Sequence, residues 1–295
     1  MKKRAPPVPK TPREICRQLF GNPEPPAEVW EKQFDYCYDE LEKLAHKDWR
    51  LMDENDLGIY LLDLKYVEPL QPDLFRYLFP VCLALWQECL MQERFFEGEA
   101  CTFLDVLQRG NLFERMMTFD ERQAVQDFMS EALIRSLGQP RRFASEEVFW
   151  MHTLTNFGAL IPKIPEVWTR WWTFDLPGKA VAALMFASLL MYSDTENPIF
   201  RSPRFVPRVS KVMDYRFDEG WLEPNLAFLH DTLTVDYLQT KIAEAATVLQ
   251  HEPEGKLAAR LVTDAKERQD IIPIFIEDLL TELRYPDSPY GKPRA

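Results

Sequence analysis

Residues 74–91 read LFRYLFPVCLALWQECLM, and this stretch decides the class of fold. The segment is apolar on nearly every side, which is typical of a helix buried inside a protein core. It predicts the central helix of the first half of the chain. Pro80 lies within it, and because proline lacks an N–H and clashes with the preceding turn, it either kinks this helix or starts a second one.

Signals for helix starts recur on both sides of this segment. Thr11-Pro12-Arg13-Glu14 is a capping box with proline at the first helical position, and it predicts a helix to about Phe20. Asp53 or Asn55 caps another helix, and Thr118 with Glu121 begins a third that ends at Leu137. Apolar periodicity, prolines and caps predict further helices at 26–44, 100–108, 145–155, 166–174, 178–193, 224–230, 235–249, 254–268 and 271–283.

Signals for β-strands are few. Val, Ile and Thr do not cluster in alternating runs, and no Asn-Gly or Asp-Gly hairpin turn occurs. The sequence therefore predicts an all-α fold of about ten to twelve helices, arranged as an irregular multi-helix bundle or a short helical-repeat-like stack.

The predicted organisation has two helical halves between irregular ends. Residues 1–10 form a basic, proline-rich arm, 11–138 an acidic helical half and 139–285 a second helical half, joined at the string GQPRRFAS. The second half contains a long basic loop at 194–217. The tail at 286–295 is expected to be disordered.

Composition narrows the function classes. The 295-residue chain has a net charge of -12, which argues against general nucleic-acid binding because such binding depends on Lys and Arg neutralising phosphates. The longest apolar stretch, 180–192, is shorter than the ~20 residues of a membrane span, so no membrane is expected among the partners. Five cysteines without CxxC spacing fit reduced thiols in the cytoplasm.

Motifs for common enzyme classes are missing. The chain has 10 glycines and no Walker-type, GxGxxG, GxSxG or HExxH sequence, and we expect no cofactor. One alternative remains open. An adjacent His230-Asp231 pair, with His152 upstream and Asp264 downstream, has the residue types of metal-dependent phosphohydrolases of the HD type, whose imidazoles and carboxylates hold a metal that activates water. In that alternative His230 and Asp231 are catalytic, whereas a hydrogen-bonded structural histidine is the simpler interpretation.

Three groups of residues are candidate binding sites for another protein. Acidic residues predicted on one helix would form a negative face: Glu31, Asp35, Asp39, Glu40 and Glu42. A Trp-rich segment offers either a core or a groove for a partner, through Trp168, Trp171 and Trp172. The long loop adds positive charges that either pair with the acidic half or meet an acidic partner: Arg201, Arg204, Arg208 and Lys211.

Together these features favour a non-enzymatic protein-binding module in the cytoplasm. The uneven charge is the main clue, since an acidic face complements a partner with a basic surface. An inhibitor or immunity-type protein of bacteria and an adaptor both suit this description. The alternative is the metal-dependent hydrolase centred on His230 and Asp231.

Overall fold

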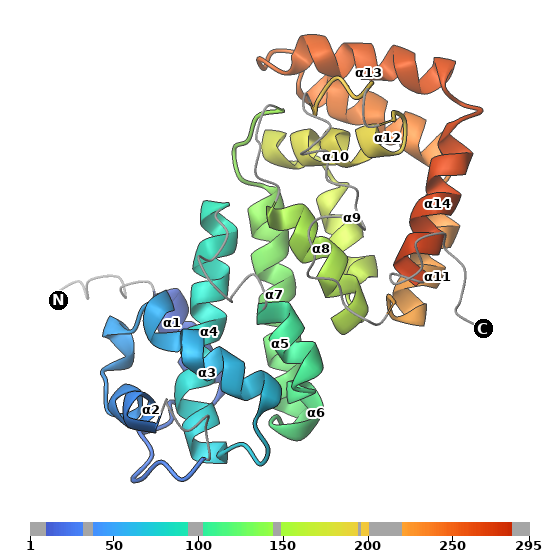
Figure 1. The fold of residues 1–295 in the computed structure, drawn as a ribbon. Coiled ribbons are helices and arrows are strands. Elements are labelled where there is room, and N and C mark those ends of the chain that lie inside the picture. Colours follow the sequence, from blue (N-terminus) through green and yellow to red (C-terminus); the bar gives the residue numbers. More distant parts are fainter. Residues whose placement is uncertain are drawn as a thin grey trace, which may run out of the picture. The chain divides into compact units, whose positions relative to one another are not determined.

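The computed structural model describes residues 10–31, 38–93, 103–143, 149–193, 196–200 and 220–284. Within these ranges the regular structure consists of fourteen α-helices and one 3-10 helix, so the predicted all-α fold is confirmed (Figure 1). The chain divides into two compact units, Met1–Val125 (unit 1) and Gln126–Ala295 (unit 2). The predicted halves 11–138 and 139–285 stay a prediction.

Unit 1 is built around one long helix. Its helices are α1 (Pro12–Leu19), α2 (Tyr38–Ala45), the 3-10 helix Trp49–Leu51, α3 (Glu54–Tyr66), α4 (Pro72–Gln92), α5 (Phe103–Arg109), α6 (Leu112–Arg115) and the first part of α7 (Phe119–Leu137). Helices α1 and α2 pack on α4, and α3 packs on α5. The boundary with unit 2 falls inside α7.

Helix α4 is the predicted central helix. It runs through Pro80 as one helix, so the alternative of a second helix starting there is wrong. Its rings stack in the core: Phe75 lies 4.7 Å from Phe79, and Phe79 lies 5.8 Å from Phe103 of α5, centroid to centroid. By length and composition α4 could cross a membrane, but 83% of its most apolar stretch is buried inside the protein. This burial is what the core helix of a folded domain shows.

The capping signals are confirmed. Thr11 and Glu14 form the reciprocal capping box at the start of α1. Asp53, rather than Asn55, caps α3, and the hydroxyl of Thr118 accepts the N–H of Glu121 at 3.3 Å. Local side-chain chemistry therefore decided where these helices begin.

The predicted helix at 26–44 is wrong at its start. Residues 26–31 are not helical, residues 32–37 lie outside the described ranges, and α2 occupies only Tyr38–Ala45. The reason is tertiary: the backbone N–H groups of Trp30 and Glu31 are bonded to the buried side chain of Gln71, so they do not enter a helix.

In its described residues, unit 2 contains the second part of α7 and seven further helices. These are α8 (Phe149–Leu160), α9 (Ile164–Trp171), α10 (Pro177–Leu189), α11 (Glu223–Thr232), α12 (Val235–Val248), α13 (Gly255–Glu267) and α14 (Ile272–Arg284). Helix α12 packs on α10 and α13, and α11 packs on α9 and α14 (Figure 1). Helix α8 extends five residues past the predicted end at 155, and its predicted cap Ser145 lies outside the described ranges.

Candidate functional site

Residues 28–31 form a short non-helical segment, called the strap, that is tied to the start of α4 by Gln71. Gln71 is fully buried, and its Oε1 accepts the N–H of Trp30 at 2.8 Å and that of Glu31 at 3.2 Å. Its Nε2 donates to the carbonyl oxygen of Glu28 at 2.8 Å. These bonds fix the backbone that holds the Trp30 side chain, which is 46% exposed.

Unit 1 carries an excess of acidic side chains without ion-pair partners. Between residues 20 and 93, six exposed carboxylates form no ion pair within the described ranges, and Lys43 is the one Lys or Arg there in the same condition. We call these carboxylates the acidic set: Glu24, Glu28, Glu40, Glu42, Asp53 and Asp73. Because none of these carboxylates forms an ion pair with a described side chain, they contribute a negative field at the surface of unit 1.

The predicted acidic face is only partly at the surface. Glu40 and Glu42 are exposed on α2, and Asp39 belongs to α2, but nothing is described of its side chain. Asp35 lies outside the described ranges. Glu31 is 1% exposed, so its place on an exposed face is corrected: the strap turns this residue into the protein.

Glu31 instead joins a second buried carboxyl. Its Oε2 accepts the backbone N–H of Gln71 at 2.5 Å, and burial raises its pKa to about 7 against the lowering effect of this bond. Asp63 of α3 is fully buried, and burial together with the charge of Glu31 raises the pKa of Asp63 to about 7. Two acids with such pKa values are neutral for part of the physiological pH range.

The Trp-rich segment lies in the core of unit 2. Trp168, Trp171 and Trp172 are at most 2% exposed. Trp168 stacks on Trp172 with ring centroids 5.2 Å apart, and its Nε1 donates to the hydroxyl of Tyr237 at 2.9 Å. Trp171 Nε1 donates to the carbonyl oxygen of Lys179 at 3.2 Å. In this structure the three tryptophans are therefore core residues, and almost none of their surface is available to a partner.

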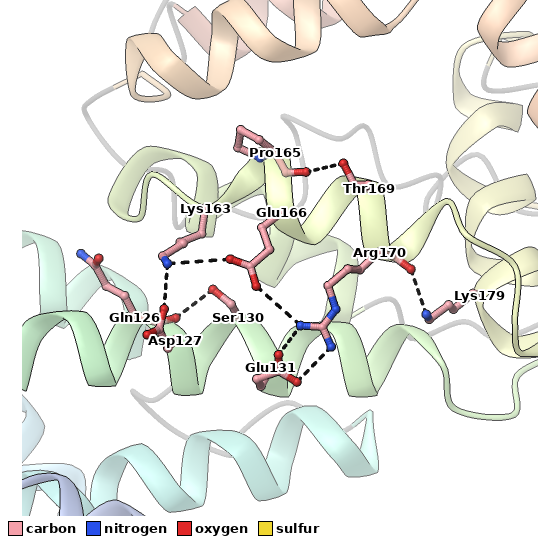
Figure 2. Close-up of polar contacts among 10 residues, drawn as sticks. All are labelled: Gln126, Asp127, Ser130, Glu131, Lys163, Pro165, Glu166, Thr169, Arg170 and Lys179. Carbon is pink, nitrogen blue, oxygen red and sulfur yellow. Dashed lines mark hydrogen bonds and ion pairs between the residues drawn. The ribbon is translucent and has the colours of Figure 1, made fainter.

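An ion-pair network ties α7 to α9 over this core (Figure 2). Arg170 binds both carboxylate oxygens of Glu131, and its Nη1 lies 3.6 Å from Glu166. Lys163 bridges Asp127 at 2.7 Å and Glu166 at 3.7 Å. The partly exposed pairs link the two helices and add modest stability.

The network continues to the start of α10. The Nζ of Lys179 donates to the carbonyl oxygen of Arg170 at 2.8 Å (Figure 2). It also pairs with Asp175 at 2.7 Å. Gly178 lies against the backbone carbonyls of Gly138 and Gln139, where a Cβ atom has no room. The start of α10 is therefore held closely on the 138–140 turn.

A small pocket opens beside this contact. Its volume is about 190 Å³, and its walls include Val181 and Leu249. Arg142 and Glu254 at its rim form a bidentate pair, with Nη1 3.0 and 3.1 Å from the two carboxylate oxygens. Arg141 and Glu252 also line the pocket, so the lining holds two positive and two negative side chains. It therefore favours neither an anion nor a cation.

The residues of the metal alternative do not gather into a site. His152 is buried on α8, where Asn156 Nδ2 lies 3.3 Å from its Nδ1 and burial lowers its pKa to about 4. His230 and Asp231 are exposed on α11 and contact each other at 3.2 Å. Asp264 accepts hydrogen bonds from Arg260 and Tyr192. In the described ranges no three His, Cys, Asp or Glu residues are placed to hold a metal ion.

The basic-loop residues Arg201, Arg204, Arg208 and Lys211 lie outside the described ranges. Sequence reasoning missed three features: the exposed Trp30, the buried Gln71 and the Glu31–Asp63 pair. The adjacent Pro25 and Pro26 were a signal that the chain before Trp30 is irregular. No sequence signal pointed to Gln71, because its partners lie about 40 positions away.

No protein-family model matches the chain, and searches of curated proteins and solved structures find none that is significantly similar.

Proposed function

We propose that the chain is a non-enzymatic protein-binding module that captures a partner with a basic surface through unit 1. The acidic set is the observation that supports this proposal, since among the described residues between 20 and 93 six exposed carboxylates and one lysine form no ion pair. Uncompensated charge on one partner speeds encounter with a protein of opposite charge and disfavours partners of like charge.

Trp30 adds an anchor to this surface. Tryptophan is enriched among the residues that dominate binding energy, because it offers a large contact area and loses little conformational entropy. Here the strap backbone is already fixed by Gln71, so less ordering remains for a partner to impose. Glu28 on the same strap is exposed and belongs to the acidic set.

The biological role that we propose is that of an inhibitor, an immunity-type protein or an adaptor in the cytoplasm. The described cysteines Cys16, Cys82 and Cys89 are buried thiols, which suits a reducing compartment. If the partner is an enzyme, an inhibitor lowers its activity on binding, whereas an adaptor leaves that activity unchanged. We do not propose the metal-dependent hydrolase, because no observation of the described residues favours it.

Quantitative capture from extracts of the native host tests the proposal. The wild type is compared with Glu40→Lys/Glu42→Lys, which reverses two members of the acidic set on α2. The matched control is Glu277→Lys/Asp278→Lys, which makes the same charge change on exposed residues of α14. We expect at least one protein that the wild type and the control enrich equally and that the α2 variant loses by about tenfold or more.

The captured protein is then purified and its binding is measured against salt concentration. Affinity that falls with added salt for the wild type, and less steeply for the α2 variant, agrees with the proposal. Equal capture by all three proteins would show that the acidic set is a solubility feature and would remove the proposal.

A further inference from the structure

The buried side of the strap contains polar atoms without partners among the described residues. Within that part of the chain, both carboxylate oxygens of Asp63, Oε1 of Glu31 and the hydroxyl of Tyr60 are buried and form no hydrogen bond. Asp63 and Tyr60 are fully buried on α3, three positions apart, so they share one helix face. Buried polar atoms without partners are rare in folded proteins and call for an explanation.

No described cation compensates the two acids. On α3, Lys65 pairs with Asp105 of α5 at 2.6 Å, and on α4 the nearby titratable group is the buried thiol of Cys82.

On α2, Glu40, Glu42 and Lys43 are exposed, and at the start of α4 Asp73 is exposed as well. Two carboxylates in one buried place, with no counter-charge among the described residues, cannot both stay ionised at low cost.

We propose that Glu31 and Asp63 form a proton-operated latch: the strap stays closed on Gln71 while the carboxyls hold protons, and it opens when they release them to solvent. Opening exposes Glu31 to water together with the N–H groups of Trp30 and Glu31, which Gln71 Oε1 holds in the closed state. The latch is a property of unit 1 alone and does not depend on the proposed partner.

The direction of the pH effect follows from linkage. Both pKa values are raised in the closed state, to about 7, from ordinary values near 4 in the open state. Between about pH 4 and about pH 7, the closed state therefore binds more protons than the open state. The stability of the closed state falls as the pH rises from about 4 to about 7, and it does not change further at higher pH. Because of one such carboxyl, the equilibrium constant for opening of the strap rises about 30-fold from about pH 5.5 to about pH 8.

Hydrogen exchange of the full chain measures this opening directly. Deuterium uptake of the peptide that contains residues 28–31 is followed at about pH 5.5 and about pH 8, corrected for the intrinsic exchange rate. In the wild type we expect protection of this peptide to fall about 30-fold or more between the two conditions. In Glu31→Gln/Asp63→Asn, which cannot ionise at either place, we expect equal protection at both.

Glu28→Gln is the matched control, because it removes a carboxylate from the same strap but an exposed one. It should keep the wild-type pH dependence. If the double variant fails to fold, the same measurement on Asp63→Asn tests the latch. This variant lacks one of the two carboxyls, so the pH dependence of protection must be smaller than in the wild type. Wild-type protection that is equal at both pH values, or a pH effect that survives in the Asp63 variant undiminished, would overturn the latch.

Discussion

The buried side chain of Gln71 accepts the backbone N–H of Trp30 at 2.8 Å, across 41 positions of sequence. This one bond, with its companions to Glu28 and Glu31, replaces the helical hydrogen bonds that the periodicity of residues 26–44 predicts. It also holds the most exposed tryptophan of the described ranges at the surface of unit 1.

Replacing Gln71 with alanine should therefore destabilise unit 1. Gln71→Ala removes three hydrogen bonds and leaves buried backbone groups of the strap without partners, which should lower the free energy of unfolding by about 2–4 kcal/mol. Urea denaturation measures this loss. Gln269→Ala, on an exposed glutamine, is the control and should stay within about 0.5 kcal/mol of the wild type. Equal effects of the two substitutions would contradict the role of Gln71.

Acid should weaken unit 2 through His152. Its pKa is lowered to about 4 in the folded state, so the unfolded state binds more protons below about pH 6.5. The contribution of His152 to the free energy of unfolding is then fully present above about pH 6.5, and up to about 3 kcal/mol of it is lost as the pH drops towards 4. This pH effect is opposite in sign to that of the Glu31–Asp63 pair.

His152→Asn places a polar amide group near the position of Nδ1 and removes the imidazole that titrates. Urea unfolding followed by tryptophan fluorescence, at about pH 7 and about pH 4.5, should show a smaller acid loss in this variant than in the wild type. His230→Asn changes an exposed histidine and should retain the wild-type difference. If the acid loss is the same in all three proteins, another group causes it.

Two glycine substitutions should have opposite signs. In Gly178→Ala the new Cβ meets the backbone carbonyls of Gly138 and Gln139, which cannot move away as a side-chain end can, so we expect a loss of about 1–3 kcal/mol. In Gly58→Ala, on α3, the Cβ enters open space and the helix gains about 0.5–1 kcal/mol. Thermal denaturation of both variants compares them; a neutral Gly178→Ala would show that α10 is not held on the turn.

Two tryptophans should separate stability from binding. Trp171→Ala empties a fully buried place and should cost about 3–5 kcal/mol. Trp30→Ala truncates a half-exposed side chain, so it should cost about 1 kcal/mol or less while weakening capture of the partner. Chemical denaturation and quantitative capture of both variants give the comparison. Capture that is unaffected by Trp30→Ala would limit the binding surface to the acidic residues.

The sequence by itself determined the all-α class and most helix starts. Residues 74–91 are apolar on nearly every side. Capping by Thr11, Asp53 and Thr118 depends on groups within three residues of each other. Such local interactions are encoded in short stretches of chain.

Tertiary structure alone decided which charged and aromatic residues are available. Glu31 and Trp30 are neighbours, yet Gln71 turns one inwards and leaves the other exposed. The tryptophans at 168–172 could have formed a groove, but packing against the rings of Phe186 and Tyr237, which lie farther along the chain, buries them. Burial depends on contacts between segments that are far apart in the sequence, and the local pattern of apolar residues does not encode those contacts.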